Sequence, residues 1–232
     1  MKSIDKICVV VQARLNSQRI EKKMIRPFAD TTLMDICIKK ILDSKVVDKN
    51  GFYLSLYEGE LKDIAKKYNA NIFHRSRESA FSEGTPMTLM YEWWNKLPYD
   101  YCILVNACAP FLKASTIDNF IKTYMESDSD GMFGVVEKKN YFWNSNGEIL
   151  TPLTEAVMNT KTVKRTYEAA HCLYAGRMDK IGQGVWMGNF NNKEEIELFS
   201  MEEEECLDID YEWQFQLCEQ LFEAKKKDEL RI

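Results

Sequence analysis

The sequence has little of what several classes of protein require. Among its 232 residues there are only two histidines, so a zinc centre has almost no ligands to draw on. The longest apolar runs are strand-sized, whereas a membrane-spanning helix needs about 20 apolar residues. The net charge is −5, from 31 Lys+Arg and 36 Asp+Glu, and it gives general nucleic-acid binding no electrostatic support. We therefore expect neither a membrane nor a nucleic acid among the partners.

Cysteine spacing and the N-terminus both bear on location. The seven cysteines are odd in number, and no two have the C-x-x-C spacing. Several stand inside apolar runs, as small buried hydrophobic residues do. The first apolar stretch begins at Ile7 and is interrupted at Gln12 and Arg14, which argues against a signal peptide. These features favour a reduced, cytoplasmic location.

Motifs of three common enzyme classes are missing. The sequence contains no Walker loop, no G-x-S-x-G elbow, and no glycine in the segment that follows the first predicted strand, so it lacks the Rossmann fingerprint. A Ser-His-Asp hydrolase is therefore a poor fit. The hydrophobic content of 45% and charged content of 29% are typical of globular proteins, and the length predicts one domain over residues 1–232.

Strand-like and helix-like patterns alternate along most of the chain. Residues 6–12 form a continuous apolar, β-branched run, as expected for a strand buried on both faces. The other predicted strands are 52–57, 71–74, 101–106, 131–136, 170–175 and 196–200. The predicted helices are 31–44, 59–69, 85–97, 116–125 and 211–226. This alternation indicates a mostly parallel sheet with helices on both faces.

Some segments depart from that rhythm or invite a second interpretation. Residues 138–169 carry a turn signal at 144–147 and interrupt the alternation, so we interpret them as an inserted excursion that packs on a partner subunit. The acidic run 202–205 is predicted to be a solvated surface. The aromatic residues at helical spacing are predicted to belong to the core rather than to a cofactor site: Trp93, Trp94 and Trp213.

Ligands of open parallel sheets bind beyond the carboxyl ends of the strands, which makes 13–26, 106–113 and 206–212 candidate segments. Five cations stand in the first of these against one anion, Glu21. Such a reversal of charge in an acidic chain suggests a loop that binds phosphate oxygens. The alternative is a solvated basic loop.

Asp208 and Asp210 form the second candidate group. Carboxylates at i and i+2 of an extended segment point to one side, and such a pair can hold one Mg²⁺ together with nucleotide phosphates. The alternative is that Asp210 only caps the final helix while Asp208 is a surface charge. The cationic loop would neutralise phosphates and the paired carboxylates would place a metal, so together they predict a site for a nucleotide and its metal ion.

Several motifs, in order along the chain, resemble a known family. The stretch A-R-L-N-S-Q-R-I-E-K-K at 13–23 resembles the signature A-R-x-G-S-x-R-[IL]-P-x-K of CTP-dependent cytidylyltransferases, which include the CMP-sialic acid synthetases and spore-coat polysaccharide cytidylyltransferases. N-A-C-A-P-F at 106–111 stands in place of Q-P-T-S-P-L, and Y-E-A-A-H-C-L-Y at 167–174 in place of Y-x-x-N-G-A-[IL]-Y. L-D-I-D at 207–210 matches I-D-I-D, and the resemblance spans about residues 7–222.

The resemblance implies a Rossmann-like α/β nucleotidyltransferase fold of the nucleotide-diphospho-sugar transferase type, a homodimer formed through 138–169, and Mg²⁺ as cofactor. It implies binding of CTP and of a small-molecule acceptor. The implied nucleotide-binding residues are Ala13, Arg14, Asn16, Ser17, Arg19 and Lys23 around the phosphates, and Arg75, Gly84 and Thr85 around the cytidine. Arg14 and Lys23 are the implied catalytic residues, which stabilise charge on the leaving pyrophosphate. The implied metal ligands are Asp208 and Asp210, and the implied acceptor-binding residues are Asn106, His171 and Tyr174.

Departures from the family pattern occur in both halves of the site, although the phosphate and metal half matches better than the acceptor half. Asn16 replaces a glycine, Glu21 a proline, Asn106 a glutamine, and Ala170-His171 an Asn-Gly pair. The expected reaction is transfer of CMP from CTP to an acidic, nonulosonic-acid-like sugar, with Mg²⁺ and release of pyrophosphate. The alternatives are another acceptor such as a different sugar or a phosphonate, and a non-catalytic nucleotide-binding relative. A glycosyltransferase of similar architecture is disfavoured, because its Asp-x-Asp motif usually lies near mid-chain.

Overall fold

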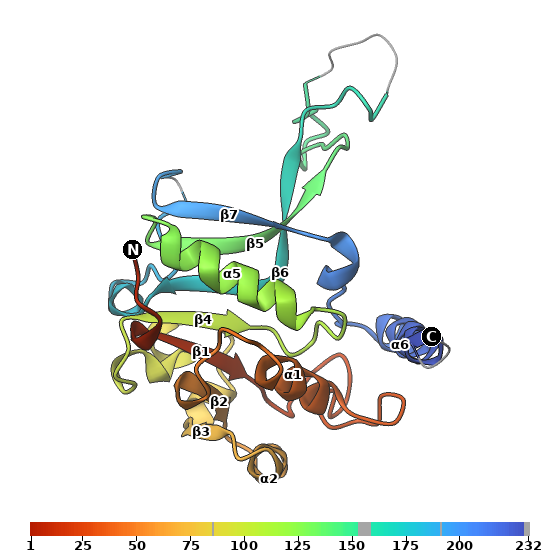
Figure 1. Ribbon diagram of the computed structural model, residues 1–232. Coiled ribbons are helices and arrows are strands. Elements are labelled where there is room, and N and C mark those ends of the chain that lie inside the picture. The colour runs from red at the N-terminus through yellow and green to blue at the C-terminus, as the bar shows by residue number, and fades with distance from the viewer. Residues whose placement is uncertain (85, 153–158, 191, 230–232) are drawn as a thin grey trace.

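A mixed sheet of seven strands organises the computed structural model, which describes residues 1–84, 86–152, 159–190 and 192–229 (Figure 1). The strand order is β3-β2-β1-β4-β6-β5-β7. Their bounds are β1 Ile7–Gln12, β2 Phe52–Leu56, β3 Asn71–His74, β4 Tyr101–Val105, β5 Gly131–Lys138, β6 Thr166–Arg177 and β7 Ile196–Met201. Strand β6 runs antiparallel to its neighbours β4 and β5, while the other described pairings are parallel. The predicted mostly parallel α/β sheet is confirmed.

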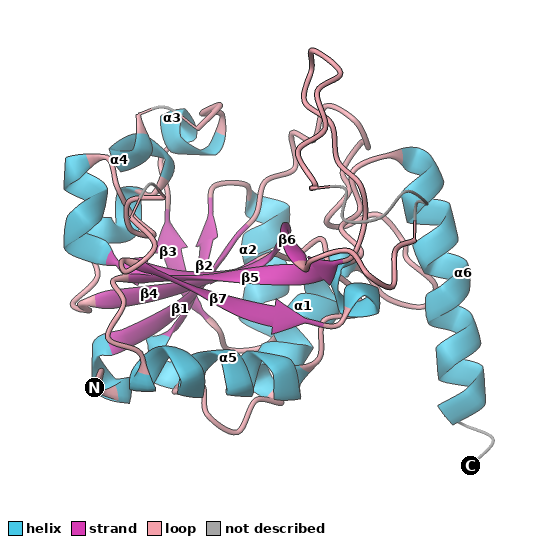
Figure 2. Ribbon diagram, turned by 90° about the horizontal axis from the view of Figure 1, so that it is seen from above, coloured by secondary structure: helices cyan, strands magenta, loops and turns pink. Residues whose placement is uncertain are grey.

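Helices of unequal length cover the two faces of the sheet (Figure 2). The longer ones, α1 Leu33–Leu42, α2 Gly59–Lys67 and α5 Ala114–Glu126, pack on one face around the larger hydrophobic cluster. Short helices pack on the other face: α3 Arg77–Ala80, α4 Met87–Met90, and the 3-10 helices η3 Glu92–Asn95 and η4 Met178–Gln183. The helix α6 Glu212–Glu229 lies at the edge of the fold, and the remaining 3-10 helices are η1 Ile4–Lys6, η2 Lys49–Gly51 and η5 Glu203–Cys206.

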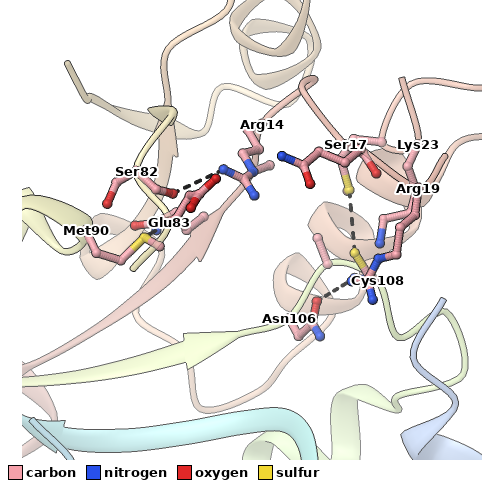
Figure 3. Close-up of a pocket in the computed structure, with 14 residues that line it drawn as sticks. Arg14, Ser17, Arg19, Lys23, Ser82, Glu83, Met90, Asn106 and Cys108 are labelled. Carbon is pink, nitrogen blue, oxygen red and sulfur yellow. Dashed lines mark hydrogen bonds between the residues drawn. The ribbon is translucent and has the colours of Figure 1, made fainter. Parts of the chain in front are cut away.

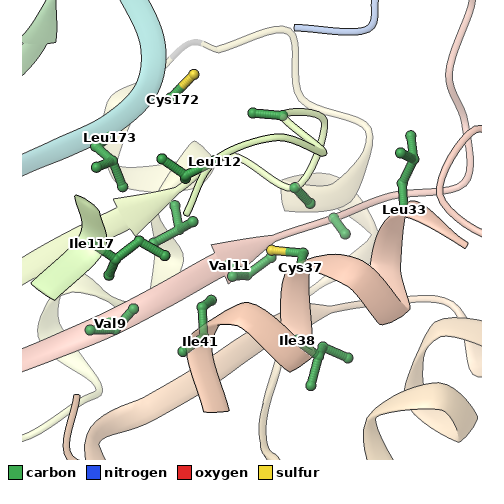
Figure 4. Packing of buried hydrophobic residues seen from close by; sticks show 14 of the residues in the cluster. Val9, Val11, Leu33, Cys37, Ile38, Ile41, Leu112, Ile117, Cys172 and Leu173 are labelled. Carbon is green, nitrogen blue, oxygen red and sulfur yellow. The ribbon is translucent and has the colours of Figure 1, made fainter. Parts of the chain in front are cut away.

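Strand β1 is buried on both faces because its side chains alternate between two cores. Val9 and Val11 belong to the cluster shared with α1 and α5 (Figure 4), whereas Cys8 and Val10 contact the cluster around Trp93. All of these residues are at most 3% exposed. The continuous apolar run of the sequence is thus explained by a central strand.

Three local predictions are wrong. Residues 85–97 do not form one helix: the described part contains α4 and then η3, with Tyr91 at φ −108 and ψ 49 between them. This break lets Trp93 turn into the core, where it is 0% exposed and packs edge-on against Trp186. Trp213 was expected in the core but is 63% exposed, because α6 packs through its opposite side on Phe28. The run 202–205 is not uniformly solvated, since Glu205 is buried.

The segment between β5 and β6 leads away from the body of the sheet (Figure 1). Its described part contains the expected turn at 144–147, closed by a bond from the Gly147 amide to the Asn144 carbonyl, 3.0 Å. Trp143 and Leu150 are 50% and 63% exposed there. Residues 153–158 of the predicted excursion lie outside the described residues. Across the described ranges, no helix combines the length and apolar character that crossing a membrane requires.

Candidate active site

A cavity lies at the carboxyl ends of β1 and β4. The chain continues from β1 to β2 and β3 on one side, whereas β4 pairs on the other side, so this is the point where the strand order reverses. Open α/β sheets bind ligands at such points. The cavity has a volume of about 690 Å³, and its walls come from residues within 12–24, 82–90 and 106–108 (Figure 3).

Cations of the basic loop stand on two sides of this cavity (Figure 3). Arg14 lies beside Ser82, and its guanidinium donates to the Ser82 carbonyl, 3.2 Å. Arg19 and Lys23 lie on the other side, beside Cys108. Guanidinium and ammonium groups on opposite walls suit an extended polyanion. The loop predicted from its charge therefore does face a cavity.

Neighbouring residues of the same loop differ in what they contribute. Ala13 and Ser17 line the cavity. The Ser17 hydroxyl accepts from the Ile20 amide, 3.3 Å, and so closes the turn that precedes Lys23. Asn16 is exposed, is not part of the cavity wall, and does not have a positive φ. The residue of this loop with a left-handed conformation is Lys22, at φ 49, so Asn16 does not adopt the conformation for which glycine is favoured.

The basic loop and the acidic pair meet directly although nearly the whole chain separates them. Lys23 is buried and donates to the Ile209 carbonyl, and its ammonium lies 3.6 Å from an Asp210 carboxylate oxygen. Arg19 donates to the same oxygen at 2.6 Å. Asp208 and Asp210 line a neighbouring cavity of about 340 Å³, beside His171, rather than the cavity of Arg14.

Asp208 has the character of a cation ligand. Its Oδ1 is buried and has no hydrogen-bond partner among the described residues. Burial, and after it the Asp210 carboxylate, raises the pKa of Asp208. In the described part of the chain no three His, Cys, Asp or Glu gather as a metal cluster. Two carboxylates suffice for Mg²⁺ when phosphates and water supply the other oxygens, so these residues fit that ion.

The predicted acceptor residues converge on a third cavity, of about 420 Å³, which shares Gln12, Met90 and Asn106 with the cavity of Arg14. The Asn106 amide donates to the His171 carbonyl at 2.9 Å, and His171 Nδ1 lies 3.0 Å from the Tyr174 hydroxyl. Burial, followed by the charge of Asp208, raises the pKa of Tyr174 and keeps its hydroxyl protonated. His171 has φ 55, the left-handed conformation that suits the glycine of the family pattern.

Of the predicted cytidine residues, Arg75 and Gly84 do not line the cavity of Arg14. Arg75 is 4% exposed, and its guanidinium donates to the Ser79 carbonyl at 2.6 Å and to the Ser79 hydroxyl at 3.2 Å. Burial lowers the pKa of Arg75 to about 10. Gly84, at φ 100, lies next to the cavity residue Glu83 but does not line the cavity itself. Thr85 lies outside the described residues.

Several cavity residues were missed from the sequence. Gln12 ends β1 and lines two cavities. A polar residue that closes a buried strand at the carboxyl edge is a signal that was available. Met90 and Phe133 carried no comparable signal, because apolar residues are normally assigned to the core.

Comparisons with known proteins give a family match and several similar folds. A model of the cytidylyltransferase family matches residues 8–228. Among solved structures, a CMP:2-keto-3-deoxy-manno-octonic acid synthetase complexed with CTP is similar, with a TM-score of 0.69 at 11% identity over 95% of this chain and 99% of that chain. The 4-diphosphocytidyl-2C-methyl-D-erythritol synthase from Anaerococcus prevotii DSM 20548 has a TM-score of 0.62 at 12% identity, over 94% and 98% of the two chains.

A cytidylyltransferase from Leptospira borgpetersenii serovar Hardjo-bovis (strain JB197) has a TM-score of 0.62 at 13% identity, over 97% of this chain and 95% of that chain. At these identities the likeness to the three solved structures shows a shared fold. The family match covers most of the sequence and therefore bears on family membership as well as on the fold.

Proposed function

The chain belongs to the cytidylyltransferase family, and we propose that it transfers CMP from CTP to an acidic, nonulosonic-acid-like sugar, with Mg²⁺ and release of pyrophosphate. The observation that carries this proposal is the contact between the two charged elements. Arg19 and Lys23 reach Asp210 at 2.6 and 3.6 Å, beside an Asp208 oxygen that has no partner among the described residues. This is an arrangement that phosphates and a divalent cation would complete.

In this reaction an acceptor oxygen attacks the α-phosphorus of CTP in line, and the bond to pyrophosphate breaks. Arg14 on one wall and Lys23 on the other bind the phosphates and stabilise the charge that develops on the leaving group. Asp208 and Asp210 would hold Mg²⁺, which supplies further neutralisation of phosphate oxygens when bound. Asn106 and Tyr174, both on the wall of the 420 Å³ cavity, orient the acceptor.

One observation supports a second kind of acceptor. No Lys, Arg, Asp or Glu lines the 420 Å³ cavity in the part of the chain that the structure describes, whereas Tyr91, Phe133 and Tyr174 do. The body of the acceptor is therefore uncharged, and an acidic group on it must point toward Arg19 and Lys23. A phosphonate or another sugar with its anionic group next to the attacking oxygen meets this requirement as well.

We also propose a homodimer. The segment around Trp143 and Leu150 exposes apolar side chains away from the body of the fold, as an element that packs on a second copy would. Size-exclusion chromatography with light scattering tests this, and a mass of one chain would contradict it. The variant Leu150→Lys is expected to dissociate the dimer.

A pyrophosphate-release assay tests the reaction itself. CTP, UTP and ATP are each offered with a nonulosonic acid, an octulosonic acid and small phosphonates, in the presence of Mg²⁺. We expect release with CTP and one acceptor class, and loss of release in Asp208→Asn. Thermal shift with CTP and Mg²⁺ runs in parallel. A shift without release from any acceptor would favour the non-catalytic nucleotide-binding relative and overturn the proposal.

A further inference from the structure

Two buried charged residues that the proposed reaction does not use lie behind the loop 106–113. Lys40 of α1 is 9% exposed, and Glu205 of η5 is 3% exposed. Charged side chains are seldom buried unless a specific partner holds them. Their partners therefore indicate what the two residues do.

Lys40 holds the middle of the loop. Its ammonium donates to the Ala109 carbonyl at 2.7 Å and to the Pro110 carbonyl at 3.3 Å. Two consecutive carbonyls on one cation fix the direction of the backbone between them, and bonds to a charged donor are stronger than neutral ones. The loop is thus tied to α1 at this point.

Glu205 holds the end of the same loop. One of its oxygens accepts from the Lys113 amide at 3.0 Å, and the other lies 3.0 Å from the Lys113 ammonium. Lys113 directly precedes α5, so the buried carboxylate also satisfies a free amide at the start of that helix. The loop is therefore tied to η5, the element that precedes the acidic pair.

The loop in turn holds the acidic pair. The Cys108 carbonyl accepts from the Ile209 amide at 3.1 Å, and Ile209 lies between Asp208 and Asp210. The Cys108 amide donates to the Asn106 side chain at 2.8 Å, so the same short loop forms part of the cavity wall. A displacement of residues 109–113 would be transmitted to both carboxylates.

We propose that Lys40 and Glu205 are positioning residues, which fix the loop 106–113 and through Ile209 hold Asp208 and Asp210 in place to bind the metal. This inference rests on the proposed function, because it assigns the metal to these two carboxylates. Partners behind metal ligands commonly change metal affinity or activity by about 10–100-fold when they are removed.

The burial of Lys40 also predicts a dependence on pH. Burial lowers the pKa of Lys40 to about 8. The titratable groups that face it are Cys37 on α1, Cys172 on β6 and Glu205 on η5. Above that pH the neutral amine keeps N–H donors but loses its charge, so the bonds to the loop weaken. We expect the Mg²⁺ requirement of the wild type to rise above pH 8.

The test compares Lys40→Met and Glu205→Gln with their exposed neighbours Lys39→Met and Glu202→Gln. The primary readout is Mn²⁺ binding in the presence of CTP, followed by electron paramagnetic resonance, and the second is the Mg²⁺ concentration that gives half-maximal pyrophosphate release. We expect the Mn²⁺ dissociation constant and the half-maximal Mg²⁺ concentration to rise about tenfold in the two buried variants. Both quantities should stay within about twofold of the wild type in the controls. Lys40→Arg, which keeps charge and donors, should restore most of the affinity.

Failure of the positioning role and failure of the proposed function give different results. Folded buried variants with unchanged Mn²⁺ binding would overturn the positioning role, as would equal losses in the exposed controls. If Lys40→Met fails to fold, Glu205→Gln still decides the matter through the same binding curve. If the wild type binds Mn²⁺ with CTP but releases no pyrophosphate with any acceptor, the proposed function fails while the positioning role is still measured.

Discussion

Replacement of Asp208 by asparagine should separate activity from stability. The Asp208 Oδ1 is buried without a hydrogen-bond partner among the described residues, so the substitution removes a charge and breaks no bond to that atom. Loss of one fixed charge partner of a transferring phosphate costs about 3–4 kcal/mol of barrier, or roughly 10²–10³ in kcat. Stability should rise, because burial and the neighbouring Asp210 carboxylate raise the pKa of Asp208 and so disfavour its charged form in the folded state.

Asp210→Asn is the matched comparison for that experiment. Asp210 binds Arg19 at 2.6 Å and lies 3.6 Å from Lys23, so its replacement should lower the melting temperature as well as the rate. The assays are pyrophosphate release at saturating Mg²⁺ and thermal unfolding of both variants. Unchanged turnover of Asp208→Asn would refute the metal assignment. If Asp208→Asn loses rate only because it is less stable, the interpretation of the Asp208 Oδ1 atom as a cation ligand would be refuted.

Three further predictions concern buried or strained groups. Burial lowers the pKa of Lys40 from its ordinary 10.5 to about 8, so the folded chain loses this proton at a lower pH than the unfolded chain does. The free energy of unfolding should therefore rise between those two pH values, by an amount on the order of 3 kcal/mol. The difference in this free energy between the wild type and Lys40→Met, measured by denaturant unfolding, should show the rise, and a difference that does not change with pH would contradict it. His171→Gly should be about 1 kcal/mol more stable than His171→Ala, because His171 has φ 55 and both variants lack the imidazole; equal urea midpoints would exclude this strain. Tyr174→Phe removes the hydroxyl 3.0 Å from His171 and should raise the acceptor KM about fivefold, whereas a matching rise in the CTP KM would place Tyr174 elsewhere.

Much of the sheet could be predicted because its signals are local. The apolar run of β1 follows from burial on two faces. The alternation of strands with helices predicts the parallel pairings among β1, β2, β3 and β4, but not the antiparallel β6. The basic loop and the acidic pair stood out because they follow or precede regular elements at one edge of the sheet. Both signals depend on residues close in sequence.

What could not be predicted depends on contacts between distant segments. The break at Tyr91 accompanies the packing of Trp93 against Trp186, which lies far along the chain. Glu205 stands in an acidic run, and only the approach of Lys113 explains its burial. Trp213 matches a core pattern, yet α6 lies at the edge of the fold, so helical spacing alone did not reveal which side is covered.

The site shows the same division. Lys23 was predicted to face phosphates, but its contact with the Ile209 carbonyl spans 186 positions of sequence and could come only from the structure. Arg75 matched a family position, whereas the structure directs its guanidinium to Ser79. Charge pattern predicted which segments meet, and packing decided which side chains reach the cavity.

Calorimetric titration of CTP, with and without Mg²⁺, into the wild type, Lys23→Met and the exposed neighbour Lys22→Met tests the phosphate site most directly. We predict tight binding that needs Mg²⁺, a loss of about 10²-fold in Lys23→Met as expected for a buried charge partner, and little change in Lys22→Met. Equal CTP affinity in all three proteins, or binding indifferent to Mg²⁺, would contradict the triphosphate site between the basic loop and the acidic pair.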